Sequence, residues 1–343
     1  MLDERKIMIL AAIIDDYIAT AEPIGSRTIA RKYRIGISPA TIRNEMADLE
    51  ELGYLFQPHT SAGRIPSNKA YRFYVDSLLP LIDVDTPDMA LIQQLFDKRV
   101  NELEELVEQA AKVISKLTSY TTITLGPQLE ASNFKHIQLS RIEDTKGLLI
   151  VITNYGTISH HIIDIPSNLN DSDFIRISNV LNHNLAGKAI SELTSETKET
   201  IKNEMIEYDQ ILNILMDILV ENVDDVVENT RVVSTGRSKM LEHPEFRDVE
   251  KAKKFLHLLE QHDLITKALK TLSKPNNIIV TIGNEHRFVE LQEFSIVTAS
   301  FTVENKNLGT FGIMGPTRME YLKVISILQK VTEYLNKYIT ELI

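Results

Sequence analysis

The sequence predicts an α+β protein with an N-terminal helical unit and a larger body in which strands flank a helical block. Three observations lead to this fold class. Apolar residues recur at helical spacing over most of residues 4–79. Alternating strand patterns occupy 121–163 and return at 278–313. The segment 166–230 between them is again helical, which favours an α+β domain with a helical insertion.

Composition places the chain among ordinary globular proteins. It has 343 residues, of which 43% are hydrophobic and 25% charged, so two or three domains are expected. The absence of cysteine excludes disulfides, zinc fingers, thiol nucleophiles and iron–sulfur clusters. No apolar run approaches the roughly 20 residues of a membrane helix, and the early acidic residues do not fit a signal peptide. We therefore expect a cytoplasmic protein without membrane contact.

Charge is distributed unevenly along the chain. The net charge is −11, but residues 1–80 contain ten Lys or Arg and ten Asp or Glu, so the acidic excess lies beyond them. Two N-terminal segments, Arg27–Arg43 and Gln57–Val75, carry several cations and no acid. Because nucleic-acid binding depends on a local cationic surface, these segments are where a DNA contact is expected.

The N-terminal elements follow the order of a winged helix-turn-helix. Ser38 is a suitable N-cap, Pro39 suits the first helical position, and Gly53 provides a stop. Helices are expected at 4–20, 26–33, 38–52 and 68–79, with a tight turn at 34–37 and hairpin strands at 54–57 and 64–65. A similar helical unit with a hairpin also occurs in modules that bind only protein, and this alternative stays open.

The third helix offers side chains suited to the DNA major groove. Arg43 can pair with guanine and Asn44 with adenine, while Ile42 and Met46 point into the helical core. The loop from His59 to Arg64 would form the wing. Its small residues allow the backbone to approach the sugar–phosphate strand, and Arg64 can reach a phosphate or the minor groove.

The body is predicted in less detail. A linker is expected at 80–87 and a long helix at 88–118. Strands are expected at 121–125, 135–142, 148–153, 157–163, 278–282, 294–303 and 309–313, with a hairpin turn at 154–156. Helices are expected at 201–229, 248–273 and 317–341.

Several segments resemble the HrcA family of bacterial heat-inducible transcription repressors. QPHTSAGRIPS at 57–67 and KAYRFYVDSLL at 69–79 are similar to that family's wing, and residues 23–55 resemble its helix-turn-helix. IGNE at 282–285 and LGTFGIMGPTRMEY at 308–321 are also similar. The resemblance spans most of the chain and is weakest at about 165–275.

The resemblance implies a domain plan and a set of partners. It implies a winged helix-turn-helix at 1–80, a linker and connecting helix at 81–118, a GAF-like α/β domain at 119–165 and 232–343, and an inserted, mainly helical dimerisation domain at 166–231. It further implies double-stranded DNA as a partner, in the form of an inverted-repeat operator called CIRCE. A GroE-type chaperonin would modulate the repressor.

Site residues follow from the matching motifs. The resemblance implies DNA contacts at Ser38, Thr41, Arg43, Asn44, His59, Thr60, Ser61, Gly63 and Arg64. An inverted repeat demands two copies of the chain, so a homodimer is expected. The apolar stripe formed by Ile211, Ile214, Leu215 and Ile218 is either core or dimer contact, and we take it as the candidate dimer interface.

Other functions have weaker support. Gly283-Asn284-Glu285 and the glycines at 309–315 either border a ligand pocket or form turns. Arg318 either binds an anion or forms a structural ion pair. Adjacent strand residues such as His160 and His161 face opposite sides, so no metal site or other cofactor is expected. No catalytic motif is present, and we expect that the protein is not an enzyme. A ligand-sensing regulator and a protein-interaction scaffold remain the rival functions.

Overall fold

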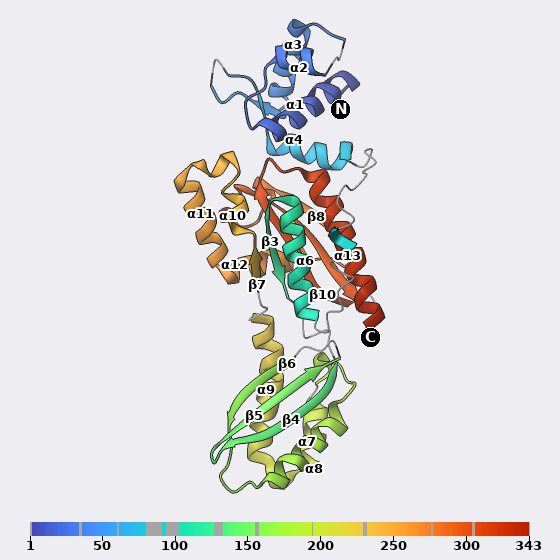
Figure 1. The fold of residues 1–343 in the computed structure, drawn as a ribbon, viewed down its shortest axis with the longest axis vertical. Helices are drawn as coiled ribbons and strands as arrows, with labels where there is room; N and C mark the ends of the chain where they lie inside the picture. The colour runs from blue at the N-terminus through green and yellow to red at the C-terminus, as the bar shows by residue number, and fades with distance from the viewer. Residues whose placement is uncertain are drawn as a thin grey trace.

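The computed structural model shows three units stacked along the long axis of the molecule (Figure 1). It describes residues 2–33, 36–59, 62–79, 91–93, 103–126, 133–154, 158–193, 195–228, 232–275, 277–303 and 306–342. An N-terminal helical unit lies at one end, a five-stranded sheet with its helices lies in the middle, and a three-stranded sheet with its helices lies at the other end.

The N-terminal unit agrees closely with the predicted elements. It consists of α1 (Glu4–Thr20), α2 (Ser26–Lys32), α3 (Pro39–Glu51), β1 (Leu55–Phe56), β2 (Ile65–Pro66) and α4 (Asn68–Phe73). The last helix continues as a π-helical turn, η1 (Tyr74–Leu78). Fully buried Ile13, Ile29 and Ile42 join α1, α2 and α3 in one core. Gly36 has the positive φ expected of it, 77°, whereas Arg34 and Ile35 lie outside the described residues.

The central unit is an antiparallel sheet in the order β7-β3-β10-β9-β8. Its strands are β3 (Thr121–Leu125), β7 (Val232–Thr235), β8 (Ile278–Ile282), β9 (Phe294–Val303) and β10 (Lys306–Pro316). The helices α6 (Leu103–Thr118) and α13 (Tyr321–Leu342) pack together on the sheet. The helices α10 (Arg237–Met240), α11 (Val249–Glu260) and α12 (His262–Thr271) lie beside it (Figure 1). Short 3₁₀ turns occur at Pro244–Arg247, Gly283–Glu285 and Val289–Leu291.

The third unit has its own sheet and its own core. Its strands are β4 (Phe134–Glu143), β5 (Lys146–Thr153) and β6 (Ile158–Asp164), in that order. Its helices are α7 (Asp171–Leu185), α8 (Ser195–Glu204) and α9 (Asp209–Glu228), with 3₁₀ turns at Ile190–Glu192 and Ile206–Tyr208. Buried residues of these strands and helices form one cluster, separate from the core of the other two units.

This arrangement corrects the predicted partition of the body. Residues 119–165 were expected to share a domain with 232–343, but among their strands only β3 joins the five-stranded sheet. The strands β4, β5 and β6 pack instead on the helices that follow them, because their inner residues are buried against α7 and α9. The described part of the insertion therefore runs from 133 to 228. The linker at 80–87 and residues Tyr155 and Gly156 of the predicted turn lie outside the described residues.

Polar contacts from α4 fix the N-terminal unit to the central unit. The Arg72 guanidinium donates to Glu285 Oε1 at 2.7 Å and to the Val280 carbonyl at 2.6 Å. The Tyr71 ring lies beside Tyr321, with 5.9 Å between centroids. These contacts hold the unit that carries α3 in a defined orientation on the body.

Candidate DNA-binding surface

The helix α3 has an exposed face and a buried face, as its sequence predicts. Ser38 caps its start by accepting a hydrogen bond from the Thr41 amide at 3.1 Å, and Pro39 occupies the first turn. Ile42, Met46 and Leu49 are buried against the unit's core. Exposed residues on the opposite face include Ala40, Arg43, Asn44 and Ala47. The face that a DNA groove would meet thus presents one cation, one amide and two methyl groups.

Two of the acidic residues of α3, Glu45 and Asp48, are paired with cations from α1. Lys6 Nζ lies 2.8 Å from Glu45 Oε2 and 3.1 Å from Asp48 Oδ2, and Arg5 lies 3.4 Å from Glu45. Hydrogen bonding to Glu45 raises the pKa of Lys6 above its usual range, so this cation stays charged. Two carboxylates that would repel a phosphate backbone are therefore balanced within the unit.

Three arginines on α2 and α3 are left for an external partner. Arg27, Arg31 and Arg43 are exposed, and within the described residues none has an ion pair or a hydrogen bond. The neighbouring Lys32 differs, because it pairs with the buried carboxylate of Asp16. Arg27 and Arg31 were not among the predicted site residues, although the acid-free run that contains them was the signal that could have identified them.

The hairpin after α3 provides the candidate wing. The strands β1 and β2 pair as Leu55 with Pro66 and Phe56 with Ile65. Gln57 Nε2 donates to the Ala62 carbonyl at 2.9 Å, which closes the described part of the loop. His59 is exposed at the tip, whereas Thr60 and Ser61 lie outside the described residues.

Gly63 and Arg64 hold the hairpin in place rather than reaching outward. Arg64 and Ile24 exchange two backbone hydrogen bonds of 2.8 and 2.9 Å. A Cβ atom on Gly63 would lie 2.4 Å from the Ile24 carbonyl oxygen, so only glycine fits. The Arg64 guanidinium donates to Glu50 Oε2 at 2.7 Å. The DNA contact expected of Arg64 stays a prediction, and in this structure Glu50 balances the charge of its guanidinium.

The candidate dimer stripe on α9 is mostly core. Ile211 is 1% exposed and Leu215 is fully buried, both within the cluster beneath the three-stranded sheet. Ile214 and Ile218 are partly buried and pack on the same cluster. The prediction of Ile211 and Leu215 as dimer contacts is therefore wrong, since strands and helices of the same chain cover them.

The exposed apolar surface of the third unit lies on its sheet instead. Ile158 and Ile162 of β6 are 60% and 66% exposed, and Ile142 of β4 is 50% exposed. Leu148 and Ile152 of β5 are directly opposite Ile162 and Ile158 and are only half-buried. We call these five residues the open sheet face.

Among the described residues no group of three His, Asp or Glu side chains could hold a metal ion. In the same part of the chain no helix is long and apolar enough to cross a membrane. Arg318 forms the structural ion pair that was one of its two predicted roles, with Nε 2.6 Å from Glu245 Oε1.

Comparisons with known proteins agree on one family. A model described as the HrcA protein C-terminal domain matches residues 104–325. A protein from Pelotomaculum thermopropionicum is 40% identical over 342 residues, covering 100% of this chain and 98% of its own. One from Ruminiclostridium cellulolyticum is 42% identical over 348 residues, covering 100% and 99%. Both are named heat-inducible transcription repressor HrcA.

A solved structure shares the fold. A crystal structure of a hypothetical protein superposes on this chain with a TM-score of 0.70 at 24% sequence identity. The match covers 100% of both chains, so the likeness extends over all three units.

Proposed function

Because this chain belongs to the HrcA family of heat-inducible transcription repressors, we propose that it silences chaperone operons by placing α3 in the major groove of an inverted-repeat operator. It is a transcription repressor of heat-shock genes and not an enzyme. Repression then requires only that the bound protein obstruct RNA polymerase, and no chemical step is needed. We expect this to take place in the cytoplasm.

The main support for this proposal is the distribution of paired and unpaired charged side chains on the N-terminal unit. Glu45 and Asp48 of α3 are paired with Lys6 and Arg5, whereas Arg27, Arg31 and Arg43 are exposed and unpaired among the described residues. Phosphate contacts need cations that are not already balanced by the protein's own carboxylates. We assign phosphate contact to Arg27 and Arg31, which adds them to the predicted site.

Base contacts are assigned to the exposed face of α3. Arg43 suits the O6 and N7 acceptors of guanine, and Asn44 suits the N6 and N7 edge of adenine. The methyl group of Ala40 can contact thymine. Ser38 and Thr41 stand at the N-terminus of this 13-residue helix, where amide groups favour a phosphate. His59, with Thr60 and Ser61 beside it, would approach the flanking strand.

The domain plan of the proposal follows the observed units. We assign the winged helix-turn-helix to residues 1–80, the GAF-like domain to the five-stranded sheet with its helices, and the inserted dimerisation domain to 133–228. The winged form is supported by the order of α1, α2, α3 and the hairpin.

The same proposal requires a homodimer, because the two halves of an inverted repeat are related by a two-fold axis. We place the dimer contact on the open sheet face. Contiguous exposed isoleucines are rare on monomeric proteins and usually indicate an interface. A second copy of the chain is the occupant that the operator symmetry requires. Modulation by a GroE-type chaperonin is supported by the family resemblance.

The charge assignment is tested by an electrophoretic mobility shift. The triple variant Arg27→Ala, Arg31→Ala, Arg43→Ala should lose retention of a duplex with the inverted repeat. The control Lys253→Met removes an exposed cation of α11, 68% exposed, and should bind as the unchanged protein does. Equal retention by the triple variant and the control would overturn the assignment. Added chaperonin should strengthen the retention of the unchanged protein.

The dimer assignment is tested by light scattering. Ile158→Glu with Ile162→Glu should give a monomer, because two buried carboxylates per copy oppose association. The control Ile175→Glu alters an isoleucine of α7 that is 63% exposed but lies off the sheet, and it should remain dimeric. A dimer in both variants would place the interface elsewhere.

A further inference from the structure

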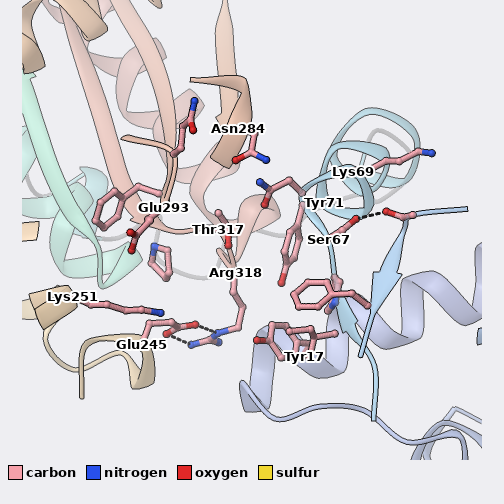
Figure 2. A pocket seen from close by; sticks show the side chains of 18 of the residues that line it. Tyr17, Ser67, Lys69, Tyr71, Glu245, Lys251, Asn284, Glu293, Thr317 and Arg318 are labelled. Atoms are coloured by element: carbon pink, nitrogen blue, oxygen red, sulfur yellow. Dashed lines mark hydrogen bonds and ion pairs between the residues drawn. The ribbon is translucent and has the colours of Figure 1, made fainter. Parts of the chain in front are cut away.

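A cleft separates the N-terminal unit from the central unit. Its volume is about 780 Å³, and its walls come from α1, the hairpin and α4 on one side and from α11, the 283–294 segment and the end of β10 on the other. Figure 2 shows Tyr17 and Tyr71 on one side of this space and Glu245 and Thr317 on the other. The volume lies within the range of small-molecule sites, which often occur between domains.

Two cations of the cleft, Lys69 and Lys251, have no carboxylate partner among the described residues, and Lys69 is already bonded to the Leu52 carbonyl at 2.8 Å. Arg318 is paired with Glu245, at 2.6 and 3.1 Å, and Glu293 is paired with Lys254 at 3.2 Å. Lys251, from the same helix as Lys254, lines the cleft and has no ion pair among the described residues. The cleft is therefore suited to a ligand that brings a negative charge.

Uncharged polar groups from both units also lack partners. The Tyr71 side chain is 2% exposed, and its buried hydroxyl has no hydrogen-bond partner among the described residues. Asn68 and Asn284 line the cleft from opposite units, and within the described residues neither side-chain amide has a hydrogen bond. Gly283, beside Asn284, allows the Asn68 amide to approach, since a Cβ there would lie 2.1 Å from Asn68 Nδ2.

Aromatic surface completes the site. The rings of Tyr17, Phe56 and Tyr71 line the wall formed by the N-terminal unit, and Phe56 is 46% exposed although it is a large apolar residue. A flat ring in the ligand would cover this surface, while the facing amides would satisfy its polar edge.

We propose that the cleft is an effector site for a small planar anion, an aromatic ring with a hydrogen-bonding edge and one acidic group. Its ring would lie on the aromatic wall, its edge on Asn68 and Asn284, and its acidic group near Lys251. Such chemistry is found in nucleoside monophosphates and in aromatic carboxylates. The inference rests on the proposed function, because its consequence is control of operator binding.

The position of the cleft explains how a bound effector would control operator binding. Arg318 links Glu245 of the body to the carbonyl of Ile18 in α1, and Arg72 links α4 to Glu285. A ligand held by both units alters the relative stability of their arrangements, and with it the orientation of α3. The factor by which the bound effector changes operator affinity must then equal the factor by which bound operator changes effector affinity.

Calorimetric titration of the full-length protein tests the site with AMP and with 4-hydroxybenzoate as probes. At least one probe should bind with a Kd below about 1 mM. Adenosine and inorganic phosphate, which each lack half of the chemistry, should bind at least tenfold more weakly than AMP where AMP is the ligand. Lys251→Met should weaken binding at least fivefold, and Lys253→Met, on the same helix but outside the cleft, should leave it unchanged.

Two results would overturn the inference. One is no binding of either probe at 5 mM, a concentration set at about five times the expected upper Kd. The other is equal binding by the Lys251 and Lys253 variants. The bound probe should also change operator affinity at least threefold. An unchanged operator affinity would contradict the proposed control of operator binding by the ligand. Operator retention without probe binding would refute only the effector site, whereas no operator retention under any condition would refute the proposed function.

Discussion

Gly63→Ala should loosen the hairpin from the helices that carry the DNA contacts. The added Cβ would lie 2.4 Å from the Ile24 carbonyl oxygen, so the two backbone hydrogen bonds between Ile24 and Arg64 must lengthen or break. Each such bond contributes about 0.5–1.5 kcal/mol net, giving a loss of about 1–3 kcal/mol. Restricting the unfolded chain returns about 0.4–1 kcal/mol. The local stability of the hairpin should therefore fall by about 1–2 kcal/mol.

Hydrogen exchange measures this loss directly. A change of 1–2 kcal/mol corresponds to roughly 5- to 30-fold faster exchange of the Ile24 and Arg64 amides. Operator affinity should fall as well, because Arg64 carries the Glu50 contact that joins the hairpin to α3.

Gly25→Ala is the matched control for this change. Gly25 lies next to Ile24, has φ −96° and ψ 150°, and an added Cβ meets nothing within 4 Å. Gly25 is the N-cap of α2, where alanine is less favourable than glycine, but alanine also restricts the unfolded chain, and these opposing effects should leave a net change of about 0.5 kcal/mol. If the Ile24 and Arg64 amides exchanged at the same rates in Gly63→Ala as in Gly25→Ala, the close approach of Gly63 to Ile24 would not be what holds the hairpin.

Three further predictions concern single side chains. Arg43→Ala should weaken specific operator binding by about 1–3 kcal/mol, and an unchanged preference for operator over mutated operator would make Arg43 a phosphate contact only. Arg31→Ala should reduce the slope of log affinity against log salt by about 1, whereas Arg64→Ala should change it less because Glu50 balances its charge; equal slopes would contradict this ranking. Burial lowers the pKa of His286 from its usual 6.5 to about 4, so the folded protein holds this ring neutral while the unfolded chain protonates it below 6.5. Stability should therefore fall as the pH drops from 6.5 towards 4, by up to about 3 kcal/mol, and His286→Asn should flatten that part of the thermal-unfolding profile.

Local patterns predicted the N-terminal unit well because its signals lie within a few residues of each other. The periodicity of α1 and the Ser38-Pro39 start of α3 depend on neighbouring positions, and both helices begin and end close to their predicted bounds. The pairing of Lys6 with Glu45 joins residues far apart in sequence, so pattern alone could not show that the Glu45 carboxylate is balanced within the unit. The same holds for the Arg64–Glu50 contact, which balances the charge of Arg64.

The body shows where single-sequence reasoning fails. Alternation predicted strands at β4, β5 and β6, but it does not specify which sheet a strand joins, because that depends on pairing over long separations. The stripe on α9 that contains Ile211 has the spacing of a buried helix face, and this spacing is the same whether the chain's own strands or a second copy covers it. Burial in the folded chain decided between the two.

The central claim is tested most directly by a hydroxyl-radical footprint of the purified protein on a duplex that carries the inverted repeat. The account predicts two protected half-sites related by two-fold symmetry, because the α3 of each copy would occupy the major groove of one half-site. Protection should disappear for the triple arginine variant. Uniform protection along the duplex, or none at protein concentrations that saturate the mobility shift, would contradict a sequence-specific dimeric repressor.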